Sequence, residues 1–464
     1  MAVVASGLLA TAAAAPTAAA HQATTRATGT HAAIIITPNV TDRFEAAAQP
    51  LTTAECEATY SVACYQGPEL QAAYNLGPLF KHGITGKGET IVIVDSFGSP
   101  TIQHDLATYD AQYHLPAPPS FKIIQPAGKF TWVANDDEEG WAGETTLDVE
   151  MAHTIAPGAR ILLVETPVSE TEGVTGFPQI VEAENYVINH NLGDVISQSF
   201  GATEETFPND ASIDALRSAY ENAYRHHVTV LAATGDDGAV DVGLNESTYY
   251  THPVVDWPPT DPLVTAVGGT ELHLNAAGKS TEPATVWNDT YDKAANELAY
   301  GDAGPNPLAT NGGLSVVFHR PAYQDSVRKV VGNQRGVPDI VMSGACDGAI
   351  QVYQSFAGAP AGWYQSCGTS EATPLFAGIV ALADQAAHHK LGLINPALYA
   401  MKAAHARGLV PVTSGNNTVS FTQDGKYYTV TGFQAKASYN LASGVGTVNA
   451  ALFVPELARF ASRR

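Results

Sequence analysis

Five short apolar runs rich in β-branched residues recur along the chain. They are TIVIVD (90–95), RILLVE (160–165), DVISQSF (194–200), VTVLAAT (228–234) and LVTAVGG (263–269). Runs of this length and composition are typical of buried strands. Segments with the apolar period of helices alternate with them, among them 209–226 and 371–389. Strands and helices in alternation predict a central, mostly parallel sheet with helices on both faces.

We expect one large α/β domain over residues 66–460. Stretches rich in Gly, Asn and Pro at 241–262 and 301–313 are interpreted as loops, and nothing between 70 and 455 resembles a domain linker. Residues 21–65 are rich in Ala, Thr and Pro without a sustained period. They predict a short extension that is loosely ordered at best.

The first twenty residues form a small-residue apolar run that ends in Ala-x-Ala. This pattern is typical of a secretory signal, although the usual basic start is missing. The alternatives are a true start further upstream or an Ala-rich disordered leader. No other run is long enough to span a bilayer, so we expect a secreted, extracellular protein.

Charge narrows the classes of partner. The chain carries 46 acidic and 23 basic residues, a net charge of -23. Such a surface repels phosphate backbones and anionic lipid, which argues against nucleic acid and membrane partners. A surplus of carboxylates loses its self-repulsion as the carboxylates protonate, so the composition is compatible with work in acid.

The chain has four cysteines, and their spacing suggests two disulfides. The suggested pairs are Cys56 with Cys64 and Cys346 with Cys367, which fits an oxidising compartment. The alternative is four buried thiols. No C-x-x-C pair argues for zinc or redox chemistry.

The segment GETTLDVEMAHTIAPGA, residues 143–159, predicts a helix closed by Pro-Gly. At 3.6 residues per turn, Glu144 and Asp148 share a face with apolar residues one and two turns later. Carboxylates in this arrangement repel each other and are costly to desolvate, so a purely structural helix would keep them outside. Because two carboxyls held close on a buried face cannot both ionise easily, one pKa rises. The pattern indicates acid–base chemistry.

Three further candidates follow predicted strands, where open parallel sheets carry their chemistry. Asp95 ends TIVIVD, and Asp236 follows VTVLAAT in the turn GDDG. Because Asp is common in turns for its own local hydrogen bonds, a structural role for Asp236 stays open. SCGTSEATP places Ser370 at the start of an apolar helix. There it is either a helix cap or a nucleophile beside peptide N–H groups that can hold an oxyanion.

A nucleophilic serine needs a base, and the histidines do not supply an obvious one. No HGTH-like segment is present, and His153 points away from the two carboxylates on its helix. The adjacent histidines at 226–227 and 388–389 cannot face one ligand together, and there is no H-E-x-x-H motif. We expect no zinc-protease site and interpret the histidines as surface or packing residues.

Three of these segments together resemble the sedolisins, serine-carboxyl peptidases that share the subtilisin fold but replace its histidine with glutamate. CGTSEATP is similar to their nucleophile motif, GETTLDVE to their E-x-x-x-D helix and ATGDDG to their oxyanion turn. Weaker similarities extend over residues 70–452. The resemblance implies a subtilisin-like three-layer α/β domain with a central mostly parallel sheet.

The resemblance also implies roles. Glu144 is the general base and then acid for Ser370, and Asp148 orients it. Asp236, in its protonated form, donates a hydrogen bond to the tetrahedral oxyanion beside the Ser370 N–H. Asp95 extends the network behind Asp148. The remaining carboxylates near these motifs are interpreted as solvated or turn residues: Asp237, Glu139 and Glu150.

The chain departs from the family pattern in two places. Phe200 stands where many members carry tryptophan, which removes a hydrogen bond at the edge of the network. At the family's calcium site, Pro411 and Asn440 replace aspartates, and Lys436 and Ser438 replace glycines. Calcium prefers several oxygens, carboxylates above all, and a nearby lysine opposes it. We expect no cofactor, with family-type calcium absent or bound very weakly.

These features predict a secreted, acid-acting serine-carboxyl endopeptidase that cleaves protein or peptide substrates as a monomer. The alternative is a catalytically silent homologue kept as a binding or structural protein, which the lost calcium ligands favour. The retained buried carboxylates, which are costly to fold around, favour an enzyme. The sequence leaves open whether the enzyme is an endopeptidase or a tripeptidyl exopeptidase, and which residue it prefers before the cleaved bond.

Overall fold

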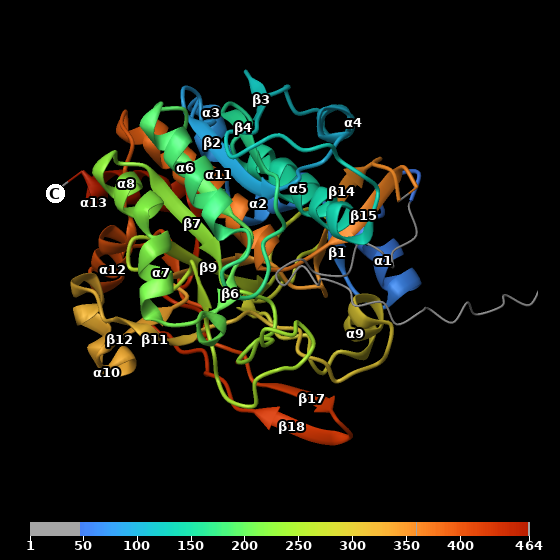
Figure 1. Cartoon of the computed structure of the whole chain (residues 1–464). Helices are drawn as coiled ribbons and strands as arrows, with labels where there is room; N and C mark the ends of the chain where they lie inside the picture. The colour runs from blue at the N-terminus through green and yellow to red at the C-terminus, as the bar shows by residue number, and fades with distance from the viewer. Residues whose placement is uncertain (1–46, 359, 463–464) are drawn as a thin grey trace, which may run out of the picture. The chain divides into compact units, whose positions relative to one another are not determined.

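The centre of the structure, a computed structural model that describes residues 47–358 and 360–462, is an eight-stranded sheet (Figure 1). Its strands are β2 (Thr90–Ser96), β3 (Phe121–Ile124), β4 (Arg160–Thr166), β5 (Val195–Gln198), β7 (Thr229–Ala233), β9 (Thr265–Glu271), β10 (Thr285–Val286) and β13 (Ile340–Ser343). The spatial order is β10-β9-β7-β5-β2-β4-β3, and β13 pairs with β9. Every neighbouring pair is parallel except β10 with β9. The predicted mostly parallel sheet is confirmed.

The described residues form thirteen α-helices. They are α1 (Thr53–Tyr60), α2 (Gly67–Ala73), α3 (Gly77–Lys81), α4 (Ile102–Tyr113), α5 (Asp136–Ile155), α6 (Phe177–Asn189), α7 (Asp210–Leu216), α8 (Ser218–Arg225), α9 (Lys293–Tyr300), α10 (Arg328–Val331), α11 (Thr369–Ala387), α12 (Asn395–Ala403) and α13 (Ala450–Ala461), with short 3-10 turns η1 (Glu204–Thr206) and η2 (Ala322–Val327). Helices α5 and α11 pack on one face, and α6 and α8 on the other. Alternate residues of β2 divide between the two cores: Ile91 and Ile93 lie on the α5 side, Val92 and Val94 on the α6 side. Strands buried on both faces are apolar throughout, which explains the uninterrupted runs in the sequence.

The remaining strands form small sheets around the centre. They are β1 (Cys64–Tyr65), β6 (Ala202–Thr203), β8 (Asp256–Trp257), β11 (Gly313–His319), β12 (Gln334–Val337), β14 (Ala349–Gln354), β15 (Gly362–Ser366), β16 (Leu409–Val410), β17 (Val419–Gln423), β18 (Lys426–Val430) and β19 (Thr447–Val448). The two predicted disulfides, Cys56–Cys64 and Cys346–Cys367, both form. None of the helices in the described ranges is long and apolar enough to cross a membrane.

Residues 47–65 differ from the expectation of loose order. Helix α1 begins with a capping box between Thr52 and Glu55, and Cys56 joins it covalently to β1. Strand β1 then pairs in parallel with β14, which lies nearly 300 residues further along the chain. A two-residue strand shows no periodicity, so the order comes from long-range pairing that the local pattern does not reveal. The signal-like residues 1–20 lie outside the described residues.

Candidate active site

Ser370 lies at the start of a long buried helix. It is the second residue of α11, and Gly368, just before the helix, has a φ of +122°. Only glycine adopts this conformation without strain, so the sharp entry into the helix requires it. The disulfide from Cys346 to Cys367 ties the chain just before this glycine to the loop after β13. These constraints hold Ser370 beside the peptide N–H groups of the helix start.

Pro374 alters the hydrogen bonding of this first turn. Proline has no N–H, so it cannot donate to the carbonyl four residues earlier, which belongs to Ser370. The hydroxyl of Ser199, directly after β5, lies 3.5 Å from that carbonyl, but its single proton is shared with Asp148 Oδ1, which is closer at 2.8 Å. Within the turn, Thr373 Oγ1 donates to the carbonyl of Thr369 at 2.8 Å. The helix start therefore contacts the neighbouring strand end through Ser199.

Helix α5 supplies the two carboxyls predicted to face this serine. The Asn135 side chain caps the helix by accepting two peptide N–H groups, and the first turn is acidic, where the helix dipole favours negative charge. From Trp141 to the end of the helix every residue is buried. The sequence predicted one buried face, but α5 packs against α11, β2, β14 and α4, which enclose it on all sides.

Glu144 faces Ser370 from this helix. Burial raises the pKa of Glu144 well above its usual range, the charge of Asp95 raises it further, and hydrogen bonding with the Ser370 hydroxyl lowers it. Neither carboxyl oxygen of Glu144 forms a hydrogen bond of ordinary geometry with a described residue, so the contact with Ser370 is weaker than an ordinary hydrogen bond. Catalytic contacts are often long until substrate binds.

Asp148 lies one turn further along α5. Its Oδ1 accepts a hydrogen bond from the Ser199 hydroxyl at 2.8 Å. Burial raises the pKa of Asp148 well above its usual range, as do the charges of Asp95 and Glu144. Ser199, which contacts both the carboxyl pair and the helix start, was missed by the sequence analysis. Its position directly after a predicted strand was the available signal.

Asp236 reaches the site from the turn after β7. Its Oδ1 accepts two hydrogen bonds from Thr369, from the peptide N–H at 2.7 Å and from Oγ1 at 2.8 Å. Its Oδ2 is buried without a described partner. Burial raises the pKa of Asp236 to about 7, although both bonds from Thr369 lower it. The group is therefore largely protonated in acid, with Oδ2 available to hold the proton.

Asp95, the last residue but one of β2, lies near the two carboxyls of α5. Burial raises the pKa of Asp95 to about 7; hydrogen bonding with Thr145 lowers it, and the charge of Glu165 on β4 raises it. Neither Asp95 oxygen has an ordinary hydrogen-bond partner among the described residues.

Phe200, at the position expected to lack a hydrogen bond, packs edge-on against the rings of Trp141 and Phe177.

One of the carboxylates interpreted as solvated or turn residues, Glu150, differs from that expectation. Glu150 is buried and accepts the Tyr353 N–H at 3.1 Å, because the enclosed helix α5 has no solvent face there. Asp237 does lie in the predicted turn, but burial and the charges of Asp241 and Asp236 raise its pKa well above the usual range. It belongs to a second group of carboxyls behind Asp236.

The residues of the site thus gather from separate elements. Asp95 lies near the end of β2, Ser199 and Asp236 follow β5 and β7, and Glu144 with Asp148 reaches them from α5. None of the ion pairs formed by described residues includes these carboxyls. Without a nearby cation, such a group of acids retains protons.

The chain spans little more than half the length of curated relatives that it matches. Kumamolisin from Bacillus sp. (strain MN-32) is 31% identical over 362 residues, which cover 74% of this chain and 56% of that protein. Sedolisin from Pseudomonas sp. (strain 101) is 28% identical over 372 residues, or 79% and 57% of the two proteins.

The fold and the family agree with these similarities. A solved structure of Pseudomonas sedolisin, a serine-carboxyl proteinase complexed with two molecules of pseudo-iodotyrostatin, superposes with a TM-score of 0.68 at 25% identity, covering 85% of this chain and 97% of that one. Residues 131–432, more than half of the chain, match the subtilase family. The chain belongs to the subtilase family and, within it, to the sedolisins.

Proposed function

We propose that the protein is a secreted, acid-acting serine-carboxyl endopeptidase with Ser370 as its nucleophile. The observation that carries the proposal is that three buried carboxyls gather around the helix start that carries Ser370. They belong to Glu144, Asp148 and Asp236, and the pKa of each is raised. Strongly perturbed carboxyls beside a serine at a helix start are typical of catalytic sites. The serine-carboxyl proteinase among the similar structures supports the same chemistry.

In the proposed reaction, Ser370 Oγ attacks the carbonyl carbon of the peptide bond while its proton passes to Glu144. Asp148 holds Glu144 in position. The peptide oxygen becomes an oxyanion, which accepts hydrogen bonds from the Ser370 N–H and from the protonated Asp236 Oδ2. Glu144 then gives its proton to the leaving amine. Water, deprotonated by Glu144, attacks the carbonyl carbon of the acyl group; as the bond to Ser370 Oγ breaks, Glu144 returns the proton to this oxygen and the acid product leaves.

The proposed reaction needs Asp236 to keep its proton, which it does below a pKa of about 7, so Asp236 limits activity on the alkaline side. Glu144 must be ionised to accept the Ser370 proton, and its raised pKa limits activity on the acid side. Two disulfides suit an oxidising compartment outside the cytosol. Protein or peptide substrates and a monomeric state complete the proposal.

The test is cleavage of a denatured protein from pH 2.5 to 8 by the wild type, Ser370→Ala, Glu144→Gln and a control, Glu297→Gln, on the exposed side of α9. We expect activity to peak in acid, below the pKa of about 7 of Asp236, to be lost in the first two variants and to persist in the control. An alkaline optimum that survives Glu144→Gln would sink the proposed base. Mass spectrometry of the products separates internal cleavage from stepwise release of tripeptides.

A peptide-aldehyde probe distinguishes the silent homologue. An assembled site adds the Ser370 hydroxyl to the aldehyde as a hemiacetal, because the adduct resembles the tetrahedral intermediate. Folded wild-type protein that neither cleaves substrate nor binds the aldehyde, across the same pH range, would favour a binding or structural role.

A further inference from the structure

The turn that corresponds to the family's calcium site does not fit a calcium ion in this chain. Asn440 Nδ2 donates to the carbonyls of Lys436 at 3.1 Å and Ser438 at 3.2 Å. Its Oδ1 accepts the N–H groups of Ala442 at 3.0 Å and Ser443 at 2.9 Å. Because carbonyls lie on one side and N–H groups on the other, the amide has one satisfied orientation. The carbonyl oxygens of Lys436 and Ser438, which could otherwise bind a cation, already accept hydrogen bonds from Asn440 Nδ2.

The ammonium group of Lys402 also holds this turn. Lys402, on α12, donates from Nζ to the carbonyls of Ala437 at 3.0 Å and Val445 at 2.9 Å. The side chain is partly buried, and burial lowers its pKa. A divalent cation beside this ammonium would meet like charge as well as carbonyls that are already occupied. The remaining family position is Pro411, which has no carboxylate.

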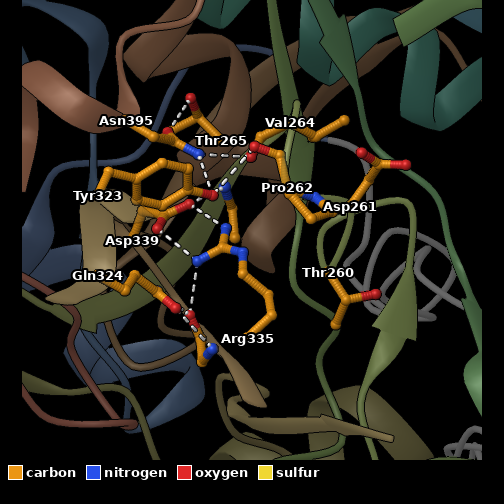
Figure 2. A network of polar contacts seen from close by, with 12 residues as sticks. Thr260, Asp261, Pro262, Val264, Thr265, Tyr323, Gln324, Arg335, Asp339 and Asn395 are labelled. Carbon is orange, nitrogen blue, oxygen red and sulfur yellow. Dashed lines mark hydrogen bonds and ion pairs between the residues drawn. The ribbon is translucent and has the colours of Figure 1, made fainter. Parts of the chain in front are cut away.

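Helix α12 joins this turn to the sheet. One turn before Lys402, the Tyr399 hydroxyl donates to Asp339 Oδ1 at 2.8 Å. Asp339 is paired with the buried Arg335 and accepts the Val445 N–H through its carbonyl at 2.8 Å. Figure 2 shows this polar network around Arg335 and Asp339, with Tyr323, Gln324 and Asn395 pointing into it. Asp339 also accepts the Ala266 N–H, at the beginning of β9.

We infer that the Lys402 ammonium and the Asn440 carboxamide replace a metal ion in this chain, and that they make the C-terminal turn and its attachment to β9 and β13 independent of calcium. One helix carries both the cation for the turn and the hydroxyl for the buried ion pair, so the turn is positioned from within the chain. A carboxamide provides donors where a calcium site requires acceptors.

The first experiment measures thermal unfolding of the full-length Ser370→Ala protein, which prevents self-cleavage, in EGTA, in CaCl2 and in equal MgCl2. We expect the three Tm values to agree, because no calcium contributes to the native state. A Tm that falls in EGTA and recovers with calcium but not magnesium would overturn the inference. This result does not depend on peptidase activity.

The second experiment tests the two residues. Lys402→Met and Asn440→Asp each remove donors from the exposed or partly buried carbonyls of this turn, so each is expected to lower Tm by about 2 °C relative to its matched control. The matched controls are Lys329→Met on the exposed side of α10, and Asn275→Asp, whose side chain accepts the N–H groups of Ala277 and Lys279 through Oδ1. If Lys402→Met and Asn440→Asp have the same Tm values as their controls, the inference is overturned. If Asn440→Asp does not fold, the Tm of Lys402→Met and the calcium series still decide the question.

Discussion

At the scale of single residues, the position of one proton on Asp236 decides how the site can act on an oxyanion. The Oδ1 atom already accepts two hydrogen bonds from Thr369, whereas Oδ2 has no described partner. A proton on Oδ1 would meet these donors, so the acid form carries it on Oδ2. Below a pKa of about 7, Asp236 therefore presents a donor at Oδ2.

The variants Asp236→Asn and Asp236→Ala test this assignment. An asparagine can still accept from Thr369 through Oδ1 and donate through Nδ2, so it should retain more kcat than alanine, which should lose about 10²–10³-fold. Because an amide does not ionise, Asp236→Asn should also lose the decline in activity near pH 7 that ionisation of the parent residue produces. Equal losses in both variants, or an unchanged alkaline limb in kcat against pH, would contradict the assignment.

The candidate site was largely predictable because its residues carry ordered signals. Glu144 and Asp148 share a helix face with apolar residues, and Ser370 lies in a glycine-led helix start. Ser199 was not predictable in the same way, because a serine after a strand is common and its role depends on Asp148 from another element. The energetic environment of Asp237 was hidden for the same reason: its neighbouring carboxyls come together only in the fold.

At the scale of elements, local pattern predicted what each segment forms but not everything that it contacts. The five apolar runs correspond to β2, β4, β5, β7 and β9, since strands buried on both faces are recognisable alone. The helical segment 209–226 divides into α7 and α8 at Arg217. Periodicity identified one face of α5, whereas its complete burial depends on distant elements that cover the other faces.

The buried Arg335–Asp339 pair gives a prediction at this scale. Both side chains are fully buried, and the pair connects β12 with β9 and α12. Replacing Arg335 by Met leaves the Asp339 charge without its partner, so the free energy of unfolding should fall by about 3–5 kcal/mol. The control, Arg320→Met, breaks a pair with the exposed Asp325 and should cost no more than about 1 kcal/mol.

Urea unfolding of both arginine variants in the Ser370→Ala background measures the difference, with the slope of each transition checking that the unfolded states match. If Arg335→Met is no less stable than Arg320→Met, the buried pair does not hold these elements together. A double variant with Asp339→Asn should recover part of the loss, because it removes the unpaired charge.

At the scale of the whole molecule, many acidic side chains are buried in the interior as well as exposed on the surface. Burial raises the pKa of Glu184 to about 8 and of Asp289 to about 8. The pKa values of Glu150, Glu170 and Glu371 are also raised well above the usual range, with burial as the largest cause. Because these groups ionise more easily in the unfolded chain, the native state holds more protons than the unfolded state at mildly acidic to neutral pH.

Stability should therefore fall as pH rises. A carboxyl whose pKa is raised on folding contributes fully below its unfolded pKa and loses that contribution as pH rises through its folded pKa. For Glu184 this window runs from its ordinary value of 4.5 to about 8. Each extra native proton lowers the free energy of unfolding by about 1.4 kcal/mol per pH unit. Urea unfolding of the Ser370→Ala protein between pH 4 and 8 measures the slope.

The variant Glu184→Gln assigns part of that slope to one residue. Glu184 is buried and accepts the Gln198 amide at 2.6 Å, a bond that a glutamine oxygen can keep. Because glutamine resembles the protonated acid and cannot ionise, the slope should become shallower by about one proton between pH 5 and 7. The exposed Glu297→Gln should leave it unchanged. A stability that rises over this range, or an equal slope in both variants, would mean that the buried carboxyls are already ionised in the native state and that acid does not favour this fold.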